Sequence, residues 1–184
     1  MAYPCSHLYC NHTSNQKQLQ SVEAFLRSGM INLLFLASLG SGSVSAAAEP
    51  SLTGTPSVID ADTLELHGTR VRLEGVDAPE GHQTCLLNGN PWRCGQAAAL
   101  ALADHIGGRA LNCKGQETDR YGRTLAVCWL GSEDLNAWLV AEGWALAYRR
   151  YSSAYVGQER AAQQAKRGIW ASVFVPPWVW RKNQ

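Results

Sequence analysis

The sequence predicts an α+β domain in which a small barrel of about five short strands packs against about three helices. A chain of 184 residues, 46% of them hydrophobic, has the size of one domain with one core. After residue 56, short runs of alternating apolar and polar residues are typical of strands. Stretches rich in helix-forming residues and ending at glycine follow.

The predicted strands lie in two blocks, and the domain is expected to begin at Ser57 after a polar lead-in at 49–56. The run SVIDADTLELHGTRVRLEGVDAPE, residues 57–80, breaks at His67 and Gly68, which predicts a hairpin followed by a further strand. Residues 110–115 (ALNCKG) and 123–130 (RTLAVCWL) are expected to pair around the turn GQETDRYG.

Three segments predict helices. Residues 94–108 (CGQAAALALADHIGG) are rich in Ala and Leu, and residues 133–143 (EDLNAWLVAEG) have an apolar face. Residues 152–168 (SSAYVGQERAAQQAKRG) are expected to start at a serine cap and to stop at Gly168. Residues 173–184 form a tail with two prolines that is expected to lie along the domain surface.

Residues 1–48 are predicted to be an N-terminal extension that contains a signal peptide. Residues 30–48 (MINLLFLASLGSGSVSAAA) are an apolar run followed by the small residues that signal peptidase accepts. The run is shorter than the ~20 residues that cross a bilayer, so we expect cleavage rather than a stable membrane anchor. Translation from Met1, with Arg27 as the positive flank, and translation from Met30 both fit. The mature protein is expected to be periplasmic or secreted.

The cysteines after this extension favour disulfides. Cys85 and Cys94 bracket a loop whose Asn-Gly and Asn-Pro steps favour turns, while Cys113 and Cys128 lie on the two strands of the second predicted pair. None of the spacings is the C-x-x-C that is typical of zinc sites. We therefore predict two local disulfides, which suit an exported protein.

The overall charge does not predict a partner. The formal net charge is +1, and from residue 49 onward 14 Lys and Arg balance 14 Asp and Glu. Proteins that bind nucleic acid usually carry a basic excess, because neutralising phosphate supplies most of the non-specific affinity. Any such affinity must here come from a few locally placed cations.

Two charged clusters interrupt the predicted strands, at residues 60–80 and 118–123. Neighbouring carboxylates repel, so either a cation holds them together or one of them is protonated. Calcium takes oxygen ligands, so Asp62 and Asp77 are candidate calcium ligands. Arg72 lies within a strand, where an unpaired guanidinium is costly to bury. The anion that pairs with Arg72 is either a phosphate, which Arg123 would also bind, or the carboxylate of Asp77 or Glu74 in a structural salt bridge.

The runs VIDADT (58–63), VRLEGVDAPE (71–80) and TDRYGRTLA (118–126) resemble the signature stretches of the staphylococcal nuclease family, in the same order. The resemblance covers residues 58–170. It implies a five-stranded OB-fold barrel with three helices at 57–172, followed by the tail at 173–184. It also implies a monomeric, calcium-dependent nuclease that cleaves DNA or RNA and leaves 3′-phosphate products.

The resemblance assigns roles to individual residues. Asp62 and Asp77 would ligate calcium, Ala78 would offer a backbone carbonyl where the family has threonine, and Glu80 would orient or deprotonate the attacking water. Arg72 and Arg123 would hold the phosphate, while Asp119 would shape the turn that aims Arg123. Tyr148 and Tyr151 fall where the family stacks aromatic rings on the substrate base, although packing under the last predicted helix is the alternative.

The chain departs from the family in the loop after Glu80. The family prototype has a lysine-rich mobile loop beside the active site, whereas this chain has HQTCLLNGNPWRCG, with a disulfide expected across it. A stapled, nearly neutral loop would change access for the substrate, and His82 is interpreted as an exposed loop histidine. A non-catalytic nuclease-like binding module and an exported accessory protein of the cell envelope remain alternative functions.

Overall fold

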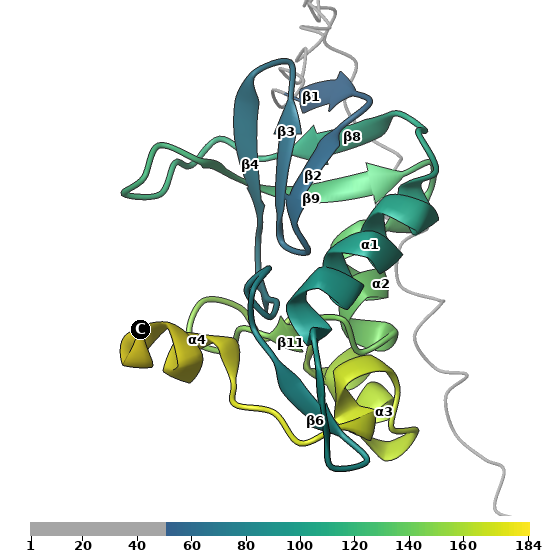
Figure 1. Ribbon diagram of the computed structural model, residues 1–184. Helices are drawn as coiled ribbons and strands as arrows, with labels where there is room; N and C mark the ends of the chain where they lie inside the picture. Colours follow the sequence, from purple (N-terminus) through teal and green to yellow (C-terminus); the bar gives the residue numbers. More distant parts are fainter. Residues whose placement is uncertain (1–50) are drawn as a thin grey trace, which may run out of the picture. The chain divides into compact units, whose positions relative to one another are not determined.

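The computed structural model describes residues 51–184, so the predicted signal peptide lies outside the described residues (Figure 1). Its main feature is a curved seven-stranded sheet in the order β1-β8-β9-β4-β3-β2, with β10 paired to β9. The strands are β1 Ser51–Gly54, β2 Ser57–Asp60, β3 Thr63–Leu66, β4 Thr69–Leu73, β8 Leu111–Lys114, β9 Thr124–Leu130 and β10 Glu133–Asp134. Neighbouring strands are antiparallel except β4 and β9, which are parallel.

Two small antiparallel sheets extend from this barrel. One pairs β5 (Val76–Asp77) with β11 (Leu146–Ala147), and the other pairs β6 (Cys85–Leu87) with β7 (Asn90–Trp92). In the first of these sheets, strand β5 follows shortly after the end of β4 in the chain. It therefore carries residues 76 and 77 away from the barrel toward the helices.

The helices are α1 Cys94–Ile106, α2 Leu135–Ala141, α3 Val156–Gln164 and α4 Pro177–Trp180, with 3-10 turns at Gly168–Ala171 and Arg181–Asn183. The end of α1 is as predicted, because Gly107 adopts a left-handed conformation (φ +57°) and its N–H bonds to the carbonyl of Ala103. The predicted serine cap of α3 is wrong. Tyr155 occupies that position, and the Ser152 hydroxyl instead accepts the N–H of Ala154.

Two terminal segments contribute more structure than the sequence suggested. The lead-in at 49–56 contains β1, which pairs with β8 from Ser51 opposite Lys114 to Gly54 opposite Leu111. Leu52 packs against the core, so the sheet begins ahead of Ser57. The tail at 173–184 holds α4 and its following turn. In the part of the chain that is described, no helix has the length and apolar character required to cross a membrane.

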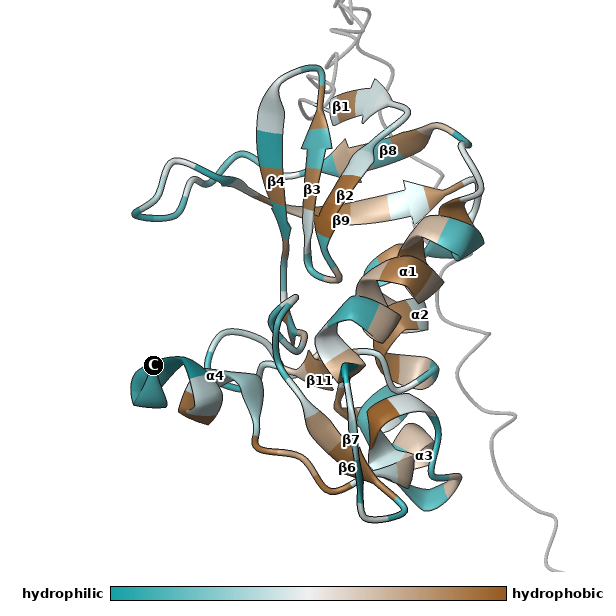
Figure 2. Cartoon of the chain, in the orientation of Figure 1, coloured by the Kyte–Doolittle hydropathy of each residue, from teal (hydrophilic) through white to brown (hydrophobic). Residues whose placement is uncertain are grey.

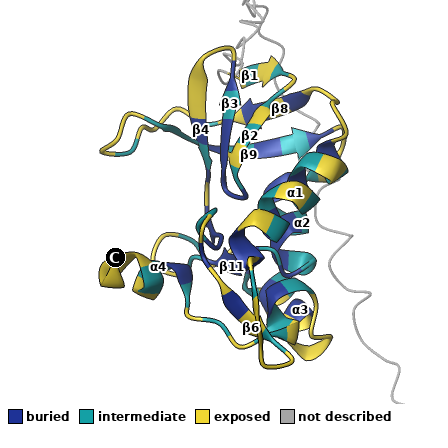
Figure 3. Ribbon diagram, in the orientation of Figure 1, coloured by how far each residue is buried: buried dark blue, intermediate teal, exposed yellow. Residues whose placement is uncertain are grey.

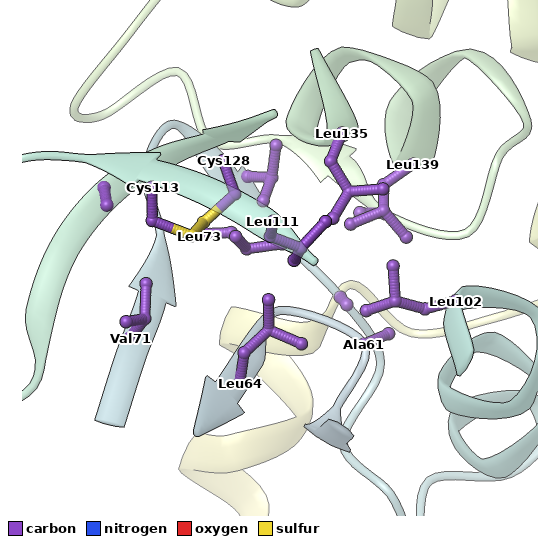
Figure 4. Packing of buried hydrophobic residues seen from close by; sticks show 14 of the residues in the cluster. Ala61, Leu64, Val71, Leu73, Leu102, Leu111, Cys113, Cys128, Leu135 and Leu139 are labelled. Carbon is purple, nitrogen blue, oxygen red and sulfur yellow. A yellow bond between two sulfur atoms is a disulfide. The ribbon is translucent and has the colours of Figure 1, made fainter. Parts of the chain in front are cut away.

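The main core lies between the sheet and helices α1 and α2. Apolar residues alternate with polar ones along the strands, and the buried set gathers where the helices face the sheet (Figures 2 and 3). The Cys113–Cys128 disulfide lies among these buried leucines (Figure 4). A second apolar cluster contains Cys85, Cys94 and Leu146, packed by several tryptophans. Both predicted disulfide pairings are confirmed.

We predict that removing the Cys113–Cys128 bridge with a Cys113→Ala/Cys128→Ala double variant lowers the free energy of unfolding by about 3 kcal/mol. The bridge closes a separation of 15 residues, whose loop entropy gives that magnitude. Urea unfolding of the oxidised proteins measures the difference. A count of four reactive thiols in denatured wild-type protein would contradict both bridges.

Candidate active site

Asp62, Arg72 and Asp77 meet where the barrel joins the first small sheet. Asp62 lies in the turn between β2 and β3, and its neighbour Thr63 stands opposite Arg72 in the pairing of β3 with β4. Asp77 lies on β5, which starts three residues after β4 ends at Leu73. Three separate elements therefore bring one cation and two carboxylates together.

Arg72 bridges the two aspartates. Its Nη1 pairs with the carboxylate of Asp62, and its Nη2 donates to Asp77 Oδ1 at 2.7 Å and to the carbonyl of Val76 at 3.3 Å. Burial lowers the pKa of Arg72 more than the charge of Asp77 raises it. The salt-bridge partners of Arg72 are thus Asp77, as considered, and Asp62 in place of Glu74.

The three predicted calcium ligands lie together. Asp62 Oδ2 accepts the backbone N–H of Ala78 at 2.8 Å, and Asp62 Oδ1 accepts the hydroxyl of Thr63 at 3.1 Å. Calcium prefers carboxylate and backbone carbonyl oxygens as ligands. The site offers two carboxylates and an adjoining backbone segment, so these residues are chemically suitable calcium ligands. Among residues 51–184, no group of three or more acidic, His or Cys side chains is gathered closely enough to hold a metal ion by itself.

Glu80 lies on the loop after β5, and its side chain is 27% exposed. Gln83, which is fully buried, fixes this loop by accepting the N–H of Glu80 at 3.3 Å. The start of α1 packs closely on the same segment: a Cβ at Gly95 would lie 1.7 Å from the Glu80 carbonyl oxygen. Only glycine allows that approach, so the position of Glu80 depends on α1 and on the disulfide at Cys94.

Arg123 is aimed at the site by Asp119. Arg123 Nε donates to Asp119 Oδ2 at 2.7 Å, while the backbone N–H groups of Arg123 and Tyr121 donate to Asp119 Oδ1 at 3.0 and 2.9 Å. Burial would raise the pKa of Asp119, but these hydrogen bonds and the charge of Arg123 outweigh it and lower the pKa. Arg123 Nη1 lies 3.4 Å from the Thr63 hydroxyl, beside Asp62.

The two tyrosines lie together, with their rings edge to face at 4.9 Å. Tyr151 is 68% exposed, whereas the face of Tyr148 is stacked by Trp178 of α4 at 5.8 Å. His82 is exposed and contacts Trp180 edge to face at 4.6 Å, which agrees with its interpretation as a loop histidine. Of the two residues predicted to meet a base, Tyr148 is therefore in contact with the C-terminal tail.

Sequence reasoning missed Arg181. Its Nη2 donates to both carboxylate oxygens of Asp77, at 3.0 and 2.9 Å, and its Nη1 donates to Glu80 Oε1 at 2.6 Å. These partners are 104 and 101 residues away in the chain, and no local pattern relates them. The one available signal was a cation within the aromatic run PPWVWRK.

Comparison with known proteins identifies relatives that are named as nucleases and one that is named for succinoglycan biosynthesis. A micrococcal nuclease of Shigella flexneri is 32% identical over 143 residues, covering 68% of this chain and 77% of the relative. A thermonuclease of Staphylococcus hyicus is 36% identical over 126 residues, covering 62% and 73%. The succinoglycan biosynthesis protein ExoI of Rhizobium meliloti (strain 1021) is 39% identical over 128 residues, covering 67% of this chain and 66% of the relative.

The family described as staphylococcal nuclease homologue matches residues 70–172. That range contains Arg72, Asp77, Glu80 and Arg123, nearly all of β4, and the strands β8, β9 and β10. The family resemblance and the OB-fold expected from it are confirmed. The chain belongs to the staphylococcal nuclease homologue family.

Proposed function

We propose that this protein is an exported, calcium-dependent nuclease that hydrolyses phosphodiester bonds of DNA or RNA and leaves 3′-phosphate ends. The observation that carries the proposal is the meeting of Asp62, Arg72, Asp77 and Glu80 at one place, with Arg123 directed to the same place by Asp119. The relatives named as nucleases support a hydrolase of this kind. Asp62, Asp77 and the backbone of Ala78 would hold the calcium ion.

The residues divide the chemistry between them. Water attacks phosphorus, Glu80 accepts the proton of the attacking water, and the bond from phosphorus to the 5′ oxygen breaks. The 5′ oxygen leaves as a hydroxyl after it takes up a proton from solvent water. Arg123 is bound by Asp119 through Nε, and its Nη1 is directed toward Thr63. At that position Arg123 would hold a phosphate oxygen. Bound calcium would add positive charge where negative charge develops on the phosphate. Arg72, which is nearly buried, keeps the two aspartates together.

Export is supported by the disulfides at Cys85–Cys94 and Cys113–Cys128, which persist in oxidising compartments. The retention of all five charged site residues argues against a non-catalytic binding module. An accessory role in the cell envelope stays as a second candidate, because the name of the Rhizobium meliloti relative refers to succinoglycan biosynthesis. A folded, calcium-binding protein that leaves nucleic acid intact would favour that second candidate.

We predict that Glu80→Gln and Arg123→Ala each lower the rate of single-stranded DNA cleavage by roughly 100-fold or more, because they remove the proton acceptor and a phosphate contact. Digestion with calcium and with chelator measures the effect. Glu117→Gln and Arg120→Ala are matched controls at exposed positions and should cleave like the wild type. Equal activity of Glu80→Gln and Glu117→Gln would contradict the role of Glu80.

We predict that Asp119→Asn lowers kcat/KM by roughly 10- to 100-fold, because Arg123 loses the carboxylate that orients it. The lowered pKa of Asp119 also means that its charged form stabilises the folded state above the ordinary carboxyl pKa, and that this contribution is lost as the pH falls through the folded-state pKa. Urea unfolding should therefore separate Asp119→Asn from wild type at pH 7 and bring them together in acid. A constant difference across pH would contradict the ion pair.

A further inference from the structure

We infer that the C-terminal segment, residues 176–183, is a built-in competitor of the active site: in the free protein Arg181 takes the cation position between Asp77 and Glu80, and calcium must displace it. The inference rests on the proposed function, since it concerns the same metal site. The segment lies beyond residue 172, where the family match ends. Its contacts with the site therefore lie outside the matched range.

Arg181 behaves as a cation ligated by carboxylates. One planar guanidinium spans both oxygens of Asp77 and one oxygen of Glu80, at 2.6 to 3.0 Å. Burial alone would lower the pKa of Arg181, but the hydrogen bonds and charges of Asp77 and Glu80 raise it above its ordinary value. One guanidinium group therefore pairs with two carboxylates at the same time.

The segment is held at several points besides Arg181. Trp178 stacks on Tyr148 with planes 10° apart, and Trp180 contacts His82. Just ahead of the segment, the carbonyl of Val175 accepts a hydrogen bond from the Gln83 side chain at 2.7 Å. Gln83 also bonds the backbone of Glu80, so the loop that carries the proton acceptor holds the segment as well.

Calcium and Arg181 cannot share Asp77 as it stands. The Asp77 side chain is fully buried, Oδ1 accepts from both Arg72 and Arg181, and Oδ2 accepts from Arg181. Three carboxylates, those of Asp62, Asp77 and Glu80, face the two guanidinium groups of Arg72 and Arg181. Exchanging the guanidinium of Arg181 for a divalent ion would balance these charges, so the exchange is electrostatically favourable.

Displacement would also open the stacking surface. Trp178 stacks on Tyr148, and it is only three residues from Arg181. Release of Arg181 by calcium therefore loosens the contact that covers Tyr148. Metal binding and base binding are thus coupled through one short segment. Only molecules in which the segment is undocked can bind calcium, so the apparent calcium affinity falls as the docked fraction rises.

The test measures calcium binding to the full mature chain by titration calorimetry, without nucleic acid. Arg181→Gln should bind calcium about tenfold more tightly than wild type, because the docked competitor is removed. Lys182→Gln removes the neighbouring exposed charge and should stay within about twofold of wild type. Trp178→Ala keeps Arg181 but loses the stacking contact, and an intermediate gain of about threefold is expected. The calcium-induced rise in Tm should follow the same order.

Equal or weaker calcium binding by Arg181→Gln would overturn the inference while leaving the proposed nuclease intact. If Arg181 instead contacts the substrate phosphate, Arg181→Gln would raise KM for an oligonucleotide at saturating calcium without changing calcium affinity, which also overturns it. Tighter calcium binding by a variant that cleaves nothing, beside an equally inactive wild type, would support the competitor and reject the nuclease. Absence of calcium binding in every protein would reject both.

Discussion

Burial of the Arg72 guanidinium between two aspartates is the constraint on which the site depends. A cation placed within a barrel strand must find anions close by, because leaving it unpaired and desolvated would cost several kcal/mol. Asp62 and Asp77 supply them from a turn and from a separate small strand. Pairing with Arg72 therefore fixes the distance between the two carboxylates, and it also ties the barrel to the β5–β11 sheet.

The same arrangement leaves the site with an excess of negative charge. Arg72 pairs with the carboxylates of Asp62 and Asp77. Glu80 adds a third carboxylate, which the guanidinium of Arg181 joins to Asp77. Repulsion among such groups is relieved by a second cation. In the free protein that cation is Arg181, and in the proposed catalytic state it is calcium. One electrostatic requirement thus explains both the predicted metal site and the position of the C-terminal tail.

Local patterns in the sequence predicted the parts of the fold that depend on residues close together in the chain. Alternation located the strands around Val71 and Cys128, a terminal glycine located the end of α1, and the predicted strand pair placed Cys113 opposite Cys128. The charged motifs correctly indicated which residues gather. They could not indicate that Asp62 joins Asp77 as a partner of Arg72, because that pairing depends on how β5 is oriented after β4.

Contacts between segments that lie far apart in the chain could not be predicted from the sequence. Strand β1 has a weak pattern of its own and exists because β8 offers it an edge, which agrees with the dependence of strands on their partners. Gln83 looks like an ordinary loop residue, yet it is fully buried and joins Glu80 to Val175. Arg181 meets its carboxylates only after the whole chain has folded.

The stapled loop and the tail are best understood as one structural unit. The N–H and carbonyl of Leu86, within the loop closed by Cys85 and Cys94, exchange hydrogen bonds of 2.9 Å with those of Val173. A lysine-rich mobile loop would not offer such a fixed edge. Because the disulfide holds Leu86 in place, it fixes the start of the tail, and the tail then reaches the site within eight residues, at Arg181. The departure from the family in this loop thereby supplies the anchor that lets Arg181 reach Asp77.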